Sequence, residues 1–412
     1  MCETSNLYAR VKVVTTVNNP KPSITIQPAD VMGRLPKQFF ASLVQNVNRE
    51  IAGGHDVINL GQGNPDRPTP DHIVKAAQEA VAKPLYHKYS PFTGYAFLKE
   101  AVAQRYLEDY GVTLDPEKEV AILFGGKTGL VQISQILLNP GDLCLVPDPG
   151  YPDYWSGVAL AGAEMSSLPL REENNFLPDY SSVSSQDKQR AKLMFLNYPN
   201  NPTSATAPLS FYEDTVRFAA DNNIVVASDF AYGAIGFDGH RPVSFLETPG
   251  AKEVGIEYYT LSKTYNMAGW RVAFALGNEK IISLINQLQD HIYVSLFGAV
   301  QEAAKVALTS SQQPVTDLVA VYESRRNALF AALEEIGWQA RKPGGSFFAW
   351  LPVPKGYDSA SFAELLLEKA KVAVAPGIGF GKHGEGFVRV GLLSSEDRLQ
   401  EAVHRIGRLS LF

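Results

Sequence analysis

Short runs of β-branched and aliphatic residues alternate with helix-like stretches from about residue 61 onward. Strands that are apolar along their whole length are typical of parallel sheets that helices bury on both faces. The chain therefore predicts an α/β fold in which a mostly parallel sheet forms the middle of three layers. The runs are Val120–Phe124, Leu143–Val146, Lys192–Leu196, Ile224–Ala227 and Ile256–Thr260.

A second, smaller unit is expected after this sheet. A long helical pattern from about Val315 to Gly337 leads into further apolar runs, which are predicted to form one smaller sheet closed by a helix from Ser395 to about Leu409. These runs are Ser346–Leu351, Val372–Ala375 and Phe387–Val390. The predicted organisation is an N-terminal arm (1–28), a large domain (61–308) and a small α+β domain (29–60 plus 309–412).

Composition limits the classes of function. A chain of 412 residues with 45% hydrophobic and 19% charged residues is typical of a soluble globular protein with about two domains. A net charge of −6, with no run of lysines and arginines longer than two, argues against nucleic-acid binding. The first 28 residues contain no apolar core long enough for a signal peptide or a membrane span.

The cysteines and histidines predict neither disulfides nor a metal site. Cys2 and Cys144 are the two cysteines, far apart in the sequence, and the seven histidines form no close pair that could share a zinc ion. We therefore expect no bound metal and a reducing, cytoplasmic location.

Polar motifs follow the predicted strands directly. Asn201 lies in Asn197–Thr203, Asp229 follows the next run with Tyr232 three residues later, and Lys263 follows the last run, eight residues before Arg271. In parallel sheets, chemistry gathers at the carboxyl ends of the strands, so these side chains are expected to converge. Taken singly, each also has an ordinary interpretation: a turn residue, a helix cap, a core aromatic or a surface charge.

A glycine-rich motif, Gly125–Gly129, lies between a predicted strand and a helix expected from Leu130 to Leu138. Such glycines let backbone amides approach a small phosphate, and the helix dipole favours its negative charge. A nucleotide-binding P-loop needs a glycine five residues before the Gly-Lys pair, where Ala121 stands. A small-phosphate cup is therefore preferred over a P-loop, and a plain helix-entry turn is the alternative.

Together these groups suit pyridoxal phosphate. A free lysine has a pKa of about 10.4, so a nucleophilic Lys263 needs surroundings that lower it. Asp229 would keep the pyridine nitrogen protonated, and Asn201 and Tyr232 would hydrogen-bond the phenolate oxygen of the ring. Arg271, with the amides of Gly125, Gly126 and Lys127, would neutralise the phosphate. Tyr151 is a candidate to stack on the ring, and a buried turn aromatic is the alternative.

From Val31 to Phe412 the chain resembles the fold-type-I, pyridoxal-phosphate-dependent aminotransferases of class I/II. The resemblance depends on Asn201-Pro-Thr203, Asp229-x-x-Tyr232, Ser262-Lys263 with Arg271, and Arg389-Val-Gly391. It implies that Lys263 forms a Schiff base with the cofactor and moves the proton during transamination.

The resemblance also implies roles for residues outside these motifs. Arg389 would bind the substrate's α-carboxylate with support from Asn201 and the amide of Gly63. Tyr89 would reach the phosphate of a neighbouring subunit, so the active unit would be a homodimer. This sequence departs from the usual pattern at Thr260, which keeps a hydroxyl where serine is common and belongs to the cofactor site, and at Ser204, where glycine is usual. A serine tolerates positive φ less well than glycine does.

The phrases Arg34–Leu43, Gln62–Asp66 and Phe230–Gly239 resemble those of bacterial methionine-salvage transaminases, which aminate 2-oxo-4-methylthiobutanoate. A thioether needs an apolar pocket, and Phe39, Phe40 and Tyr151 are candidates to line it. If Lys127 instead contacts an acidic side chain of the substrate, a dicarboxylic substrate is favoured. The alternatives are aminotransferases for aspartate, aromatic amino acids or LL-diaminopimelate, and a carbon–sulfur lyase on the same cofactor. A ligand-sensing regulator would need a DNA-binding module before Val31.

Overall fold

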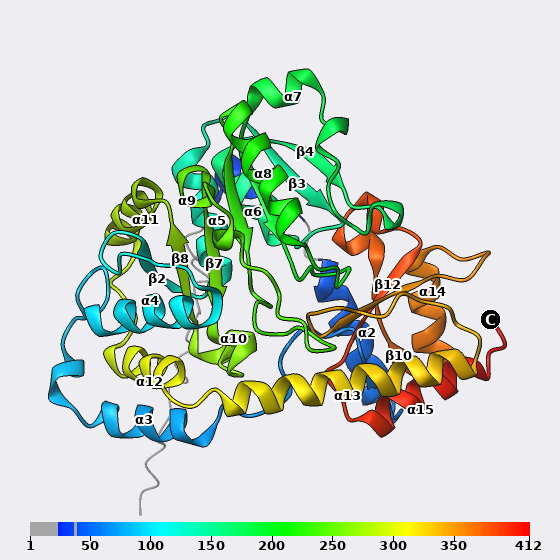
Figure 1. The fold of residues 1–412 in the computed structure, drawn as a ribbon. Helices are drawn as coiled ribbons and strands as arrows, with labels where there is room; N and C mark the ends of the chain where they lie inside the picture. The colour runs from blue at the N-terminus through cyan, green and yellow to red at the C-terminus, as the bar shows by residue number, and fades with distance from the viewer. Residues whose placement is uncertain (1–23, 37–38) are drawn as a thin grey trace, which may run out of the picture.

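The computed structural model describes residues 24–412 apart from 37 and 38, and the side chains of residues 39–41 are not described. The predicted N-terminal arm thus lies largely outside the described residues. In Figure 1 a large sheet runs through the cyan, green and yellow-green part of the ribbon, and a smaller antiparallel sheet lies in the orange and red part. The long helix α13 (Gln313–Glu335) extends from one region to the other.

The large sheet has seven strands in the order β2-β8-β7-β6-β5-β3-β4. Strands β3 to β7 pair in parallel, while β8 is antiparallel to both of its neighbours. The bounds are β2 (Val120–Phe124), β3 (Leu143–Asp148), β4 (Glu164–Pro169), β5 (Ala191–Asn197), β6 (Val225–Asp229), β7 (Gly255–Thr260) and β8 (Val272–Gly277). The mostly parallel sheet is confirmed, although β4 and β8 were not among the predicted runs.

Helices cover both faces of this sheet. Helices α5 (Gly126–Leu137), α6 (Asp153–Ala161) and α11 (Glu279–Ile292) pack on the face to which Ala227 and Tyr258 point. The opposite face, with Val226 and Tyr259, is covered by α4 (Ala96–Tyr110), α8 (Leu209–Asn222) and α12 (Gly298–Thr309). Helix α3 (Asp71–Val81) packs on α12. Neighbouring residues of one strand thus enter different cores, and the three-layer prediction is confirmed.

The smaller region contains two sheets, where one was predicted. One has the order β11-β12-β9 and is antiparallel, and the other pairs β1 with β10 in parallel. The bounds are β1 (Ile58–Asn59), β9 (Phe348–Pro352), β10 (Val372–Ala373), β11 (Ala375–Pro376) and β12 (Phe387–Gly391). The run predicted as one strand, 372–375, therefore divides between two sheets, because the N-terminal segment supplies a partner for its first half.

Helices complete this region. They are α2 (Phe39–Ala52), α14 (Ser359–Leu365), which a π-helical turn (Leu366–Ala370) continues, and α15 (Glu396–Gly407). Its core contains Ile58 and Leu60 together with Leu333, Val390 and Leu399. The segment around β1 therefore packs with the C-terminal part of the chain.

The remaining α-helices are short: α1 (Asp30–Arg34), α7 (Ser185–Arg190), α9 (Ala251–Val254) and α10 (Leu261–Thr264). Among the described residues, none of the helices combines the length and the apolar composition that crossing a membrane would require.

Candidate active site

A cavity of 790 Å³ lies at the carboxyl ends of the parallel strands. Most of the residues singled out from the sequence line it: Gly63, Gly126, Lys127, Tyr151, Asn201, Asp229, Tyr232, Thr260, Lys263, Arg271 and Arg389. Gly125 immediately precedes the wall residue Gly126. Tyr89 does not line the cavity, and its side chain is 90% exposed. The expected convergence of the strand-end motifs is therefore observed.

Lys263 lies on α10, directly after β7. Its Nζ donates to the carbonyl oxygen of Gly63 at 3.0 Å and lies 5.3 Å from the ring centre of Phe347. Burial, with the positive charges of Arg389 and Arg271, lowers the pKa of Lys263 to about 8. The protein itself thus makes this amine less basic than an ordinary lysine, as a nucleophile requires.

Asp229 ends β6 and is buried. Its Oδ2 accepts from the hydroxyl of Tyr154 at 2.7 Å, and Asn197 Nδ2 donates to its backbone carbonyl at 2.7 Å. Burial raises the pKa of Asp229 to about 6, against the opposing effects of Tyr154, the Ala231 amide and Lys263. At neutral pH it is therefore mostly an anion inside the protein, which favours a cationic group beside it.

Gly125 and Arg271 lie against each other at the start of α5. Gly125 has φ +82°, and a Cβ there would lie 2.3 Å from Arg271 Nη2, so a side chain would displace the guanidinium. Helix α5 begins at Gly126, four residues before the predicted start at Leu130. The earlier start is possible because the glycines allow close packing: a Cβ on Gly129 would lie 2.6 Å from Leu123 Cδ1. The motif is thus itself the first turn. The Gly125 amide donates to the Leu123 carbonyl at 2.8 Å, so the prediction that it binds a phosphate is wrong, and the amides of Gly126 and Lys127, which begin the helix, are the ones suited to an anion.

Arg389, on β12, lines the cavity from the side of the smaller region. Its Nη1 donates to Asn201 Oδ1 at 2.7 Å and its Nη2 to the carbonyl of Gly61 at 3.1 Å. The guanidinium carbon lies 4.0 Å from the ring centre of Phe348 and 4.7 Å from that of Phe380. Burial lowers the pKa of Arg389 to about 10, so it stays charged at neutral pH. A buried, oriented guanidinium is suited to a carboxylate.

The comparison with protein families decides the identity. The family model of aminotransferases of class I and II matches residues 55–406. The chain belongs to this family. It is 64% identical, over 94% of its length and 97% of the relative's, to L-glutamine--4-(methylsulfanyl)-2-oxobutanoate aminotransferase of Bacillus subtilis. It is 44% identical, over 93% of its length and 98% of the relative's, to LL-diaminopimelate aminotransferase of Moorella thermoacetica.

Solved structures agree with this assignment. A substrate-bound structure of BacF from Bacillus subtilis is 49% identical, covers 94% of this chain and 98% of its own, and superposes with a TM-score of 0.90. An aminotransferase from Staphylococcus aureus is 37% identical, covers 93% and 99%, and has a TM-score of 0.87. This aminotransferase is a pyridoxal-phosphate-dependent enzyme like its family.

The cavity of this aminotransferase fits that cofactor. It has a buried carboxylate for a protonated ring nitrogen, a helix N-terminus and an arginine for a phosphate, and a lysine of lowered pKa for an aldehyde. Burial raises the pKa of Tyr232 and of Tyr151, so both hydroxyls remain neutral donors at neutral pH. The Lys127 ammonium lies 2.9 Å from Asp153 Oδ1 and is thus already paired within the protein.

Sequence reasoning missed several residues of this site. Tyr154 contacts Asp229, and Asn197 accepts the amide of Asn201 at 2.7 Å through its Oδ1. Asn197 stood within a quoted motif, and its place at a strand's carboxyl end was the available signal. Phe39 and Phe40, proposed to line the pocket, have side chains outside the described part of the chain. Leu43 and Val44, one turn further along α2, line it.

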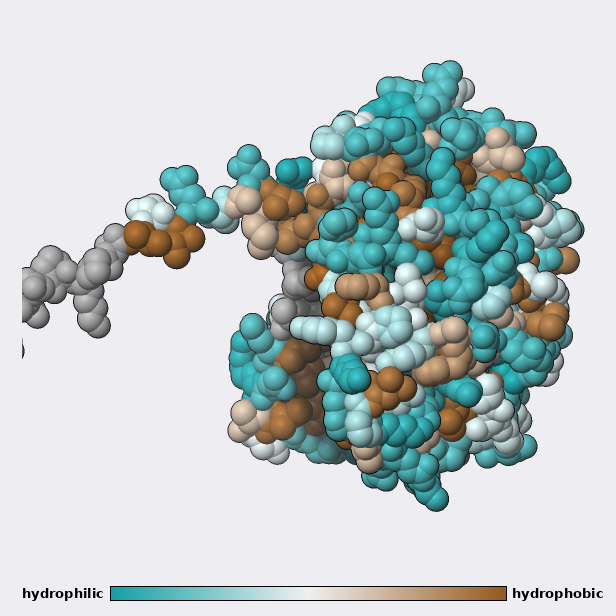
Figure 2. Space-filling view, turned by 90° about the vertical axis from the view of Figure 1, so that its left-hand side faces the viewer, coloured by the Kyte–Doolittle hydropathy of each residue, from teal (hydrophilic) through white to brown (hydrophobic). Residues whose placement is uncertain are grey.

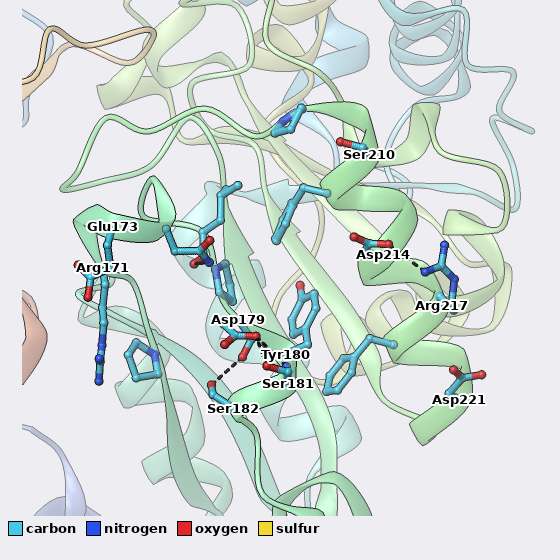
Figure 3. A pocket seen from close by; sticks show the side chains of 17 residues that line it. Arg171, Glu173, Asp179, Tyr180, Ser181, Ser182, Ser210, Asp214, Arg217 and Asp221 are labelled. Carbon is cyan, nitrogen blue, oxygen red and sulfur yellow. Dashed lines mark hydrogen bonds and ion pairs between the residues drawn. The ribbon is translucent and has the colours of Figure 1, made fainter.

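A second hollow of 880 Å³ lies on the surface between residues 169–182 and 208–221. Figure 3 shows its charged side chains bonding to their own neighbours: Arg217 to Asp214 at 2.9 Å, and Asp179 to the hydroxyl of Ser181. None of the predicted site residues lines it. Volume alone therefore does not identify the active site, and the buried charges do.

Proposed function

We propose that this aminotransferase moves an amino group onto 2-oxo-4-(methylsulfanyl)butanoate, forming methionine, with glutamine as the amino donor. The observation that carries this proposal is the 64% identity over nearly the whole length of a relative named for that reaction. The apolar part of the cavity wall supports it, since Leu43 and Val44 offer an apolar surface to a thioether.

The proposed reaction assigns a task to each buried polar group. Bound pyridoxal phosphate draws electrons away from the bonds at the substrate's α-carbon. Lys263 removes and returns the proton of that carbon, for which a pKa of about 8 suits neutral pH. Arg389 binds the α-carboxylate with Asn201 and the Gly63 amide. Asp229 keeps a proton on the ring nitrogen, while Asn201 and Tyr232 donate to the phenolate oxygen.

The remaining groups of the site orient the cofactor. Arg271, Thr260 and the backbone amides of Gly126 and Lys127 would hold the phosphate, with Gly125 leaving room for the guanidinium, and Tyr151 would cover the ring face. Thr260 is placed for this by its position at the end of β7, where its hydroxyl bonds Ser262 Oγ at 2.9 Å.

A test of the function uses single-turnover mixing of the holoenzyme with L-methionine, L-glutamine, L-aspartate, L-phenylalanine and LL-diaminopimelate in separate reactions. We expect methionine and glutamine to convert the cofactor to pyridoxamine phosphate fastest, with the matching 2-oxo acids as products. Release of ammonia and a thiol would instead indicate a carbon–sulfur lyase. Preference for LL-diaminopimelate, the substrate in the names of relatives at 44% identity, would overturn the substrate assignment.

The assignment of Lys263 has its own test. Borohydride reduction of the holoenzyme followed by peptide mapping is expected to place a pyridoxyl group on Lys263. Lys252 is a suitable internal control because its ammonium is paired with Glu119 at 2.8 Å and does not line the cavity. A pyridoxyl group elsewhere would contradict the assignment.

We also propose that the active unit is a homodimer with shared sites. Tyr89 is 90% exposed, Phe92 58% and Phe297 45%, and Ser90 Oγ bonds the Leu296 carbonyl, which holds their two segments together. An exposed aromatic patch of this kind favours an interface. Figure 2 shows the described N-terminal segment extending from the body, and its Ile24 and Ile26 are 85% and 82% exposed. Light scattering tests this proposal by comparing the molar mass of the wild type in solution with that of Phe92→Glu.

The domain boundaries given above, 29–60 plus 309–412 and 61–308 after an arm at 1–28, are likewise proposed. They are supported by the pairing of β1 with β10. A cytoplasmic location is proposed from the cysteine content, and Cys144 is buried and free.

A further inference from the structure

Two adjacent arginines of α13, Arg325 and Arg326, are buried and each binds an aspartate with both terminal nitrogens. Arg325 Nη1 and Nη2 lie 2.9 and 2.8 Å from the two oxygens of Asp66. Arg326 makes the corresponding bonds to Asp238 at 2.7 and 2.6 Å. None of these four residues lines the active-site cavity. The proposed function therefore assigns no role to either ion pair.

The two pairs hold different parts of the molecule. Arg325 Nη1 also donates to the carbonyl of Leu392 at 3.1 Å, three residues beyond Arg389. Asp66 lies in the loop between β1 and α3, which also contains Gly61 and Gly63. Arg326 Nη1 instead donates to the carbonyl of Pro343 at 3.0 Å, away from that loop.

The loop 61–66 has no regular secondary structure and is held by cations from three elements. Arg389 of β12 binds the Gly61 carbonyl, Lys263 of α10 binds the Gly63 carbonyl, and Arg325 of α13 binds the Asp66 carboxylate. The Gly391 amide, on the same strand as Arg389, donates to the Leu60 carbonyl at 2.7 Å. The guanidinium of Arg325 thus links Asp66 to the chain just beyond Arg389, while Arg389 and the Gly391 amide bind the start of the loop.

We propose that Arg325, acting through Asp66 and the Leu392 carbonyl, is a positioning residue for the substrate's carboxylate. It fixes the loop that presents Gly63 relative to the strand that presents Arg389, so that both meet the same carboxylate group. This inference depends on the proposed role of Arg389. A bidentate pair suits the task because it fixes orientation as well as distance, which a lysine at the same place cannot do.

The test compares Arg325→Lys and Asp66→Asn with the matched control Arg326→Lys. We expect the first two to raise the KM for L-methionine and for its 2-oxo acid about tenfold each, because both carry the carboxylate, with kcat changed less than about twofold. Arg326→Lys breaks a bidentate pair of the same kind. It is therefore expected to lower the midpoint of thermal unfolding about as much as Arg325→Lys does, while leaving both KM values unchanged. Asp66→Asn provides the measurement should Arg325→Lys fail to fold.

A substrate without the carboxylate separates positioning from general loosening. The rate of the half-reaction with 3-(methylsulfanyl)propylamine is expected to be the same in Arg325→Lys as in the wild type, so the preference for methionine over the amine falls about tenfold. An equal loss for both compounds, or unchanged KM values in both folded variants, would overturn the proposal. Arg389→Lys is measured beside them: if it also leaves KM unchanged, the proposed carboxylate site is wrong, and if it alone raises KM, only the role of Arg325 is wrong.

Discussion

Two buried carboxylates, Asp229 on β6 and Glu257 on β7, lie on opposite faces of the large sheet and have different surroundings. Ser228 pairs with Glu257 across the strands, and Asp229, the next residue along β6, points to the other face. Each carboxylate accepts a hydrogen bond from a tyrosine: Asp229 from Tyr154 at 2.7 Å and Glu257 from Tyr106 at 3.0 Å. Burial raises the pKa of Asp229 to about 6 and that of Glu257 to about 7.

The difference between them is what else they contact. Asp229 lines the active-site cavity, whereas Glu257 does not. Glu257 is enclosed by further donors: Ser244 Oγ at 2.5 Å, the Phe245 amide at 2.8 Å and Ser228 Oγ at 3.3 Å. A raised pKa alone therefore does not distinguish a catalytic group from a structural one. Access to the cavity does, and four substitutions test this contrast.

The largest effect is expected for Asp229→Asn. The side chain keeps its shape but loses the charge that would hold a proton on the ring nitrogen, so single-turnover conversion of methionine should fall about a hundredfold to a thousandfold. The free energy of unfolding at pH 8 should not decrease, because the wild type carries a buried charge there and the variant does not. A variant that retained a tenth of the activity would end the distinction between the two carboxylates.

Glu257→Gln should change stability and leave activity intact. The folded pKa of about 7 exceeds the ordinary value of 4.5, so the folded state binds the proton more tightly. The stability from this group is fully present below pH 4.5 and is lost as pH rises through about 7, a difference of about 3 kcal/mol. Glutamine cannot titrate, so the variant should lack this part of the decline. Urea unfolding between pH 5 and 8 measures it, and because only the slope is compared, a constant destabilisation cancels. Identical slopes would contradict the prediction.

Tyr154→Phe should have a smaller effect on activity. The hydroxyl of Tyr154 lowers the pKa of Asp229, so its loss should raise that pKa and move the acidic limb of kcat/KM to higher pH. Activity at pH 7 should fall about three- to tenfold. A pH profile of kcat/KM for the wild type and the variant provides the measurement, and unmoved profiles would show that this hydrogen bond is only structural.

Tyr106→Phe is the matched change on the opposite face and should have the smallest effect on catalysis. Removing the donor to Glu257 should cost about 1–2 kcal/mol of unfolding free energy, with kcat and KM unchanged. Urea unfolding and steady-state kinetics of the two tyrosine variants, measured together, make the comparison. An activity loss equal to that of Tyr154→Phe would mean that the sheet transmits such changes between its faces.

The sequence predicted the groups that follow strands, because local apolar runs mark the strands and the carboxyl ends of parallel strands meet at one edge of the sheet. Lys263, Asp229 and Asn201 were found in this way, and Arg271 was found by its spacing from Lys263. Ser204 was identified as a position of possible strain: its φ is +60°, and its hydroxyl donates to the Phe348 carbonyl at 2.6 Å, which offers a compensating bond.

Residues that act through distant partners could not be predicted. Tyr154 and Asp229 are 75 residues apart, and Arg325 and Asp66 are 259 apart, so no local periodicity records either contact. The divided run at 372–375 has the same cause: its apolar pattern is that of a strand, but the partner for its first half comes from β1. Local patterns thus give the elements, while the pairings between remote elements decide which side chains meet.

The pairing of β1 with β10 also has a consequence for synthesis on the ribosome. The carboxylate of Asp56, just before β1, accepts a hydrogen bond from Arg398 of α15, which lies 342 positions later. As the chain emerges from its N-terminus, the large sheet acquires all of its strands long before β10 exists. Until then Ile58 and Leu60, which are buried in the finished protein, lack the C-terminal residues that they finally contact. Translation order therefore separates the synthesis of this early apolar segment from that of the C-terminal residues that bury it in the finished enzyme.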